Sequence, residues 1–196
     1  MTIDVRPPSG IWHPGYISGR YYGVSAAAAS NTVSAANTIY LSPCIIYRPV
    51  TIANVVFNET AAATVSQTCR GAIYADVGGV PTGAPLKEGA AALDLVANGI
   101  ASADIALASS LSVNPGLIWI AFWFETSGGT FASFARHASP GGNSPIIGAT
   151  SAPGAVGGAT GGNSGYTMSS AFGASFPTLA SLSTSSTTPH VGFKVA

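Results

Sequence analysis

Carboxylates, which could act as general acids or bases, are few in this chain, and their spacing favours no reaction. Most of them fall at the ends of expected strands or in turns, where a carboxylate usually contacts water or a backbone amide. Two carboxylates that meet in space can hydrolyse a glycosidic bond, but no spacing here favours such a pair. The seven carboxylates in 196 residues are Asp4, Glu59, Asp76, Glu88, Asp94, Asp104 and Glu125.

Metal-binding and nucleophilic motifs are equally weak. His13, His137 and His190 lie far apart, and none has a cysteine, histidine or carboxylate at the spacing of metal ligands. The segment Gly162-Asn-Ser-Gly165 begins like a Gly-x-Ser-x-Gly nucleophile elbow, but Tyr166 takes the place of the last glycine. The sequence therefore predicts that the chain is not an enzyme and has no catalytic residue, metal or cofactor.

The scarcity of charge is the most informative property of the composition. Only 7% of the residues are charged, seven of them basic and seven acidic, and the net charge is zero. Ordinary soluble domains have about 25% charged residues, and proteins that stay dispersed usually keep some net charge. We therefore expect copies of this chain or other proteins to cover much of its surface, which favours a component of an assembly.

The composition also excludes several partners. Nucleic-acid binding needs clustered lysines and arginines, whereas the seven basic residues here are scattered and balanced by acids. The longest apolar run, residues 116–124, is shorter than the roughly 20 residues that a membrane-spanning helix needs. Residues 1–8 lack the basic and then apolar order of a signal peptide. We expect no nucleic acid, no membrane insertion and no secretion by that route.

Two cysteines, Cys44 and Cys69, lie in apolar stretches with the composition of strands. Two cysteines do not make a disulfide framework, and a free cysteine in such a stretch usually behaves as a small buried hydrophobic residue. Buried free thiols are therefore favoured over a bridge between the two.

Residues 1–24 differ from the rest of the chain and are expected to form an extended N-terminal arm. Three prolines and four glycines break any regular element there, yet the stretch is too aromatic for a flexible tail. The aromatic side chains could dock on a neighbouring subunit or on a particle; alternatively, the stretch is a strand-like segment packed on its own domain. The aromatic residues are Trp12, Tyr16, Tyr21 and Tyr22.

Residues 25–196 have the pattern of one all-β domain, an antiparallel β-sandwich of jelly-roll type. Short stretches rich in β-branched and aromatic residues alternate with glycine and proline turns, and no stretch has the period of an amphipathic helix. In the alanine-rich part, 86–107, two glycines and Asn98 favour weak strands joined by turns over a helix. Strands are expected at 38–49, 51–59, 68–76, 117–125, 130–136 and 190–195.

Four expectations concern the arrangement of these segments. The stretch 117–125 is apolar on both faces and is therefore expected to be central. Residues 130–136 are expected to form a hairpin with it. Pro43 and Pro49 indicate an edge strand or a bulge at the first expected strand. A loop rich in glycine and serine is expected at about 139–166, and loops of that length are usually functional or disordered.

Polar residues of the strand 68–76 have expected partners. Arg70 is expected to bury its stem and to pair with Asp76 or Glu125 within the sheet. Asp76 and the glycines Gly78-Gly79 are expected to shape a hairpin turn.

Apolar residues have expected faces. Trp119 and Trp123, four apart on one strand, should point to the same face and bury the largest area there. Ile52 and Val56 are expected to share one face of their strand. Tyr74 is expected to be an outward or interfacial aromatic residue.

Residues 37–124 have a series of features in a fixed order. They are Asn37-Thr-Ile-Tyr40, Pro43-Cys-Ile-Ile46, Val50-Thr-Ile-Ala-Asn-Val55, Cys69-Arg-Gly-Ala-Ile-Tyr-Ala-Asp76, Gly79-Val-Pro81, Pro85-Leu86 and Asn114-Pro-Gly-Leu-Ile-Trp-Ile-Ala121. This order resembles a β-sandwich module that is widespread in bacteriophage virion proteins, at the tips of tail fibres and in small head-fibre or capsid-decoration proteins. The resemblance covers somewhat under half of the chain. Cys44 stands where related sequences usually have phenylalanine, which fits a buried hydrophobic position.

The resemblance implies a non-enzymatic structural protein of the virion, since the family has no catalytic residues. It implies a small surface subunit, either a capsid decoration or head fibre or a tail fibre, that docks on other virion proteins by its N-terminal arm and projects its sandwich outward. By analogy with phage fibres, we expect a homotrimer. The expected location is the virion, after synthesis in the host cytoplasm.

A carbohydrate-binding module that recognises glycans on the host cell surface is the alternative function. Such modules often present exposed aromatic side chains, whose apolar faces suit sugar rings. The candidates here are Phe131, Phe134 and Tyr166, although a place in the core or at a subunit interface explains each of them more readily. An enzyme that acts on a polysaccharide is the third and most distant hypothesis.

Overall fold

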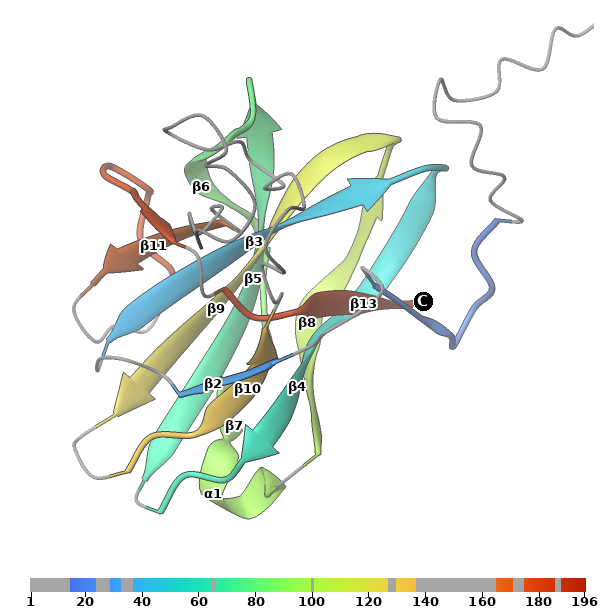
Figure 1. Cartoon of the computed structure of the whole chain (residues 1–196). Coiled ribbons are helices and arrows are strands. Elements are labelled where there is room, and N and C mark those ends of the chain that lie inside the picture. Colours follow the sequence, from blue (N-terminus) through green and yellow to red (C-terminus); the bar gives the residue numbers. More distant parts are fainter. Residues whose placement is uncertain are drawn as a thin grey trace, which may run out of the picture.

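The computed structural model describes residues 15–23, 29–32, 37–64, 66–99, 101–126, 130–136, 165–170, 175–185 and 188–196. About two thirds of these residues lie in strands, which form two antiparallel sheets packed against each other (Figure 1). The prediction of an all-β sandwich is therefore confirmed. Of the loop expected at about 139–166, residues 139–164 lie outside the described residues, and residues 165–166 begin a strand.

The first sheet is built around the long strand β4. Because β8 and β13 both pair with residues 54–57 of β4, they flank it on opposite sides. Along the sheet the order is β1 (Tyr21–Gly23), β13 (Val191–Val195), β4 (Val50–Ala61), β10 (Ser133–Arg136) and β2 (Ala29–Thr32), and β8 (Ser102–Val113) pairs with β4.

The second sheet has seven strands. Their order is β12 (Ser183–Ser185), β11 (Gly165–Ser169), β3 (Thr38–Ile46), β9 (Gly116–Thr126), β5 (Gln67–Val77) and β6 (Val80–Glu88), and β7 (Leu93–Asp94) pairs with β5. A single helical turn, α1 (Leu95–Asn98), follows β7 and is capped by the Asp94 side chain. Residues 86–107 thus span the end of β6, the two-residue β7 and the beginning of β8, joined by turns as expected apart from this one turn of helix.

Strand β9 is the central strand that its composition predicts. It pairs along its length with β3 on one side and β5 on the other. Its even-numbered residues from 118 to 124 pack in the main core between the two sheets. Its odd-numbered residues from 119 to 123 pack on the outer face of the second sheet. Both faces of β9 are therefore buried, which explains its unbroken apolar sequence.

A bulge in β4 contradicts the expectation that Ile52 and Val56 lie on the same face of the strand. The register with both neighbouring strands shifts between Ile52 and Asn54, so Ala53 is an extra residue in the alternation. Ile52 therefore joins Val55 and Phe57 in the main core, while Val56 is only half-buried. The expectation that Ile52 and Val56 share a face was wrong because the strand is not regular.

Among the described residues, Pro43 lies in a part of β3 that is locally at the sheet edge, which is one of the two alternatives expected. β3 lies between β9 and β11, but β11 pairs only with residues 38–41. Pro43 therefore falls where the β11 side of β3 has no partner strand among the described residues, and a residue without an N–H is tolerated there. Pro49 lies in the connection between β3 and β4.

The expected hairpin between 117–125 and 130–136 was wrong. β10 pairs with β4 and β2 in the other sheet. The physical reason is that β3 and β5 occupy both sides of β9, which leaves it no free edge for a hairpin partner. The chain instead crosses between the sheets before β10, where the Ala132 N–H donates to Gln67 Oε1 over 2.7 Å.

The turn between β5 and β6 is the one expected from the sequence. Gly78 and Gly79 have positive φ angles of 66° and 86°, as a two-residue hairpin loop of type I′ requires. The Gly79 N–H donates to Asp76 Oδ2 over 3.1 Å. Asp76 therefore closes the turn, as its position predicts.

Each described strand at a sheet edge is short, contains proline or has an irregular stretch. β1 and β12 have three residues each and β2 has four. β6 contains Pro81 and Pro85, which lack an N–H. In β8, residues 107–110 form an irregular stretch opposite Ala53. Short strands, prolines and bulges are devices that blunt sheet edges against pairing with other chains.

Candidate functional site

Residues 175–182, here called the strap, lie over the face of the second sheet that points away from the main core. Leu179 of the strap pairs with Gly83 of β6, and the strap leads into β12, which pairs with β11. A second apolar cluster lies beneath it. The buried residues of this cluster are Ile39, Leu41, Ala72, Tyr74, Trp119, Ala121, Trp123 and Phe176.

Phe176 anchors the strap on the sheet. Ala72 and Ala121 are direct partners on β5 and β9, and their small side chains leave room between the larger Tyr74 and Trp123. The Phe176 ring fits there, with its centroid 5.6 Å from that of Trp123 and 6.1 Å from that of Tyr74. Phe176 is only 6% exposed, so the strap buries an aromatic side chain in a seat formed by two alanines.

Tyr74 is not available to a partner. It points to the outer face of its sheet, as expected, but the strap covers it and it is fully buried. Its hydroxyl donates to the Pro177 carbonyl over 2.9 Å. The expectation of an outward or interfacial tyrosine was therefore wrong, because a later segment of the chain folds over this face. Trp119 and Trp123 share the same face and are buried there, as predicted.

Trp119 connects the strap cluster to the β5–β6 turn. Its indole Nε1 donates to Asp76 Oδ1 over 2.8 Å, while Asp76 Oδ2 accepts from Gly79. The ring of Tyr166, on β11, lies 5.3 Å from that of Trp119. Both oxygens of Asp76 are thus engaged in the turn and the tryptophan.

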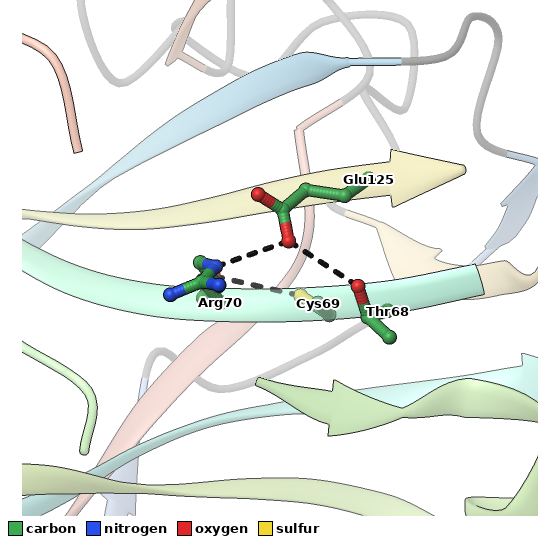
Figure 2. Close-up of polar contacts among 4 residues, drawn as sticks. All are labelled: Thr68, Cys69, Arg70 and Glu125. Carbon is green, nitrogen blue, oxygen red and sulfur yellow. Dashed lines mark hydrogen bonds and ion pairs between the residues drawn. The ribbon is translucent and has the colours of Figure 1, made fainter. Parts of the chain in front are cut away.

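Arg70 pairs with Glu125, one of its two expected partners (Figure 2). Arg70 Nε lies 3.0 Å from Glu125 Oε2, and the Thr68 hydroxyl donates to the same oxygen over 3.2 Å. The Glu125 side chain is 1% exposed and that of Arg70 is 25% exposed. Because β5 and β9 place all three side chains on one face, the sheet itself holds the carboxylate in place beside its counter-charge.

Cys44 and Cys69 are buried free thiols, as predicted. Burial raises the pKa of Cys44 to about 12. Burial also raises the pKa of Cys69, and the nearby carboxylates of Glu125 and Glu59 add to the effect. Both residues are therefore protonated at neutral pH and are poor nucleophiles.

The other carboxylates with known contacts have structural partners. Glu59 is buried at one end of the main core, where Asn98 Nδ2 donates to its Oε2 over 2.8 Å and burial raises its pKa. A raised pKa suits a general acid, but a general acid must also reach a substrate, and Glu59 is 1% exposed. Asp104 accepts from Tyr21 and from Asn54 on the outer face of the first sheet.

Of the three histidines, His190 is the one that lies among the described residues. Burial lowers the pKa of His190, so this residue is neutral at pH 7. His13 and His137 lie outside the described residues. Within the described ranges, no group of three histidine, cysteine, aspartate or glutamate side chains could hold a metal ion. None of the helices in these ranges has both the length and the apolar character needed to cross a membrane.

The N-terminal segment 15–23 belongs to the sandwich. β1 pairs with β13, and Tyr16 and Tyr22 pack with Phe193 against the main core, with ring centroids 4.9–6.0 Å apart. Tyr21 faces the opposite side and is 52% exposed, and its hydroxyl donates to Asp104 over 2.5 Å. The second alternative, a strand-like segment packed on its own domain, therefore describes residues 15–23. Trp12 lies outside the described residues.

The three aromatic residues considered for glycan contact do not form one site. Phe134 is fully buried in the main core, stacked on Phe124, so it has no surface for a ligand. Phe131 packs against the same core and is partly buried. Tyr166 packs against Trp119 in the strap cluster, on the other side of the sheet. The three rings therefore lie in different parts of the fold, as places in the core would have them.

The described surface is poorer in ions than the sequence suggests, because two of the seven carboxylates, Glu59 and Glu125, are buried. Several large apolar side chains are exposed on it. They are Ile17, Tyr21, Ile45, Val77, Val80, Leu86 and Val96. The surface itself is thus the feature that most needs a functional explanation.

No protein-family model matches this chain, and no curated protein matches it either. The resemblance inferred from the order of features in residues 37–124 therefore stays a prediction. Those residues run from β3 to β9 and supply strands to both sheets.

Proposed function

We propose that this chain is a non-enzymatic structural protein of a bacteriophage virion, a small surface subunit that associates with copies of itself. The observation that carries the proposal is the surface, which combines few ions with exposed apolar side chains. An isolated protein of this kind would present apolar area to water without net charge to keep copies apart. Contact with sister subunits or with a particle would cover that area.

The ordered features of residues 37–124, which resemble those of virion modules, support the same function, because the residues concerned have structural roles. Arg70 pairs with Glu125 across β5 and β9. Asp76 closes a turn and accepts from Trp119. Polar residues that link neighbouring strands and close turns stabilise the fold. Such roles suit a structural protein that catalyses no reaction.

Attachment to the particle is assigned to residues 1–14, with Trp12 as the aromatic anchor. Tyr16 and Tyr22 are committed to the main core of their own domain, so they are not free to dock elsewhere. Residues 15–23 would instead fix the base of the attachment segment on the sandwich. By analogy with phage fibres, the proposed assembly is a homotrimer.

Light scattering coupled to size-exclusion chromatography tests this proposal with three forms of the protein: the full chain, a form lacking residues 1–14 and a form lacking residues 1–23. The full chain and the shorter deletion should be folded oligomers, and only the full chain should bind phage particles. The longer deletion should be less stable, because it removes Tyr16 and Tyr22 from the core. A stable monomer of the full chain at high concentration and neutral pH would overturn the proposal.

A further inference from the structure

Asn98 is the only asparagine in the sequence that is followed by glycine. An asparagine side chain can react with the backbone nitrogen of the next residue, and glycine leaves that nitrogen most accessible because it has no β-carbon. Gly99 has a φ angle of 65°. Among the described residues, only its chain neighbours come within 4 Å of the place that a β-carbon would take. The described surroundings of Gly99 therefore leave space for water.

Two hydrogen bonds hold the Asn98 side chain in the folded chain. Its Nδ2 donates to Glu59 Oε2 over 2.8 Å and to the Gly99 carbonyl over 3.4 Å. Glu59 lies on β4 and Asn98 is the last residue of α1, so the first bond ties the helical turn to the first sheet. Leu95 of the same turn is fully buried in the main core. The bond between Asn98 and Glu59 therefore helps to hold α1 over the end of the core.

We propose that Asn98 is a site of spontaneous deamidation, that its hydrogen bond to Glu59 slows the reaction, and that the product breaks this contact. In the first step the Gly99 nitrogen bonds to Asn98 Cγ, and the bond from Cγ to Nδ2 breaks. Nδ2 leaves as ammonia with the proton of the Gly99 N–H. Water then opens the cyclic imide at either carbonyl, which gives aspartate or isoaspartate. The net reaction consumes a water molecule and releases ammonia.

The fold restrains this reaction without preventing it. Closing the imide ring requires the Asn98 backbone to leave its helical conformation and its side chain to leave Glu59. An unfolded chain reaches such conformations freely, whereas the folded chain must first open locally. α1 has four residues, which is too short for a helix to be stable by itself. Local opening of α1 therefore permits a slow reaction in the folded protein.

The product cannot keep the contact with Glu59. Aspartate has an oxygen where asparagine has the amide nitrogen, so two carboxylates would face each other across the present 2.8 Å contact. Glu59 is 1% exposed, so water screens their repulsion only weakly. Isoaspartate also adds a methylene group to the backbone, which changes the path of the turn. Deamidation should therefore loosen α1 from the end of the core.

Mass spectrometry tests the reaction itself. Full-length protein would be incubated at mildly alkaline pH, both folded and in urea, and its peptides examined for amide-to-acid conversion and for isoaspartate. We expect conversion of Asn98 in both samples, several-fold slower in the folded one. Asn54 is the internal control, because it is also half-buried and its Nδ2 donates to Asp104 Oδ1 over 2.6 Å, but valine follows it. Asn54 should stay unchanged over the same period.

Variants test the effect on α1. Asn98→Asp, which has the aspartate product, should lower Tm at neutral pH by about 3–12 °C, since the lost contact is a charge-assisted hydrogen bond. Adding Glu59→Gln to Asn98→Asp should restore most of this loss, measured against Glu59→Gln alone, because the new amide can donate to the new carboxylate. Asn58→Asp is the matched control: it adds the same charge at an exposed position of β4 and should change Tm little.

Four outcomes would overturn this inference. They are no conversion of Asn98 in the folded protein, equal rates in the folded and urea samples, conversion of Asn54 as fast as that of Asn98, and a Tm of Asn98→Asp that is unchanged or that Glu59→Gln does not restore. None of them bears on self-association, which the light-scattering experiment measures separately.

Discussion

Replacing Phe176 by alanine tests whether the strap is an integral part of the fold. Phe176 is 6% exposed and contacts the rings of Tyr74 and Trp123. Truncating a buried phenylalanine costs about 3–5 kcal/mol, as lost transfer free energy plus the cavity left behind. Ala72 and Ala121 form the seat beneath this ring and are too small to fill the space, so we expect a value in the upper half of that range.

This loss of unfolding free energy corresponds to a large decrease in melting temperature. For a chain of this size, each kcal/mol lowers Tm by about 2–4 °C, so Phe176→Ala should lower it by roughly 8–20 °C. Calorimetry measures this shift, and tryptophan fluorescence should move to longer wavelength before global unfolding as the strap loosens over Trp119 and Trp123.

Thr178→Ala is the matched control, because Thr178 lies two residues further along the strap and is exposed. Exposed substitutions usually change the free energy of unfolding by less than about 0.5 kcal/mol. If Phe176→Ala and Thr178→Ala melt at the same temperature with the same fluorescence, the reasoning that the strap buries this face is refuted.

Three further predictions concern the main core. Burial raises the pKa of Glu59, so the folded state favours the protonated form and its contribution to stability falls as pH rises above the ordinary carboxyl pKa. Glu59→Gln should therefore raise the free energy of urea unfolding at pH 7 but change it little near about pH 3.5; equal effects at both values would contradict this. Gly71→Ala should lower stability by about 1–3 kcal/mol, because the new Cβ would lie 2.5 Å from Val55 Cγ2; unchanged urea unfolding would show that the site has room. Cys44 and Cys69 should resist a thiol reagent at pH 8 and both react in urea, given their burial; a missing thiol in urea would indicate a disulfide.

Much of the second sheet could be predicted from local sequence. The run around Trp119 is apolar at every position, and a strand with both faces buried needs that pattern. The turn at Gly78-Gly79 was predictable because both residues adopt φ angles that glycine alone tolerates readily. The free thiols followed from the apolar surroundings of each cysteine.

Other features depend on contacts between distant residues, which local sequence does not encode. The bulge at Ala53 has no marker of its own, since alanine fits a regular strand equally well. Nothing near Phe134 indicates that its strand crosses to the other sheet; that choice follows from β3 and β5 having filled both sides of β9. Tyr74 was misplaced for a similar reason, because a segment a hundred residues later covers it.

The strap had one weak signal in the sequence. Phe176, Leu179 and Leu182 recur three apart in a serine-rich stretch, which marks a segment with apolar side chains to bury. The position of Phe176 on the sheet could not be predicted from the sequence, because it depends on the pairing of Ala72 with Ala121 and therefore on the register of two strands. The same limit applies to Arg70, because the register of β5 and β9 places Glu125 beside it, whereas Asp76 lies six residues further along the same strand and is out of reach.

The interrupted edges of both sheets affect how copies of the chain can associate. A chain with so little electrostatic repulsion is at risk of open-ended growth, in which each new molecule extends the ladder of the last. Prolines in β6, the irregular stretch of β8 and the brevity of β1, β2 and β12 remove the regular templates for such growth. The self-association proposed above would then use the broad faces of the sandwich, and strand pairing from edge to edge would not extend it.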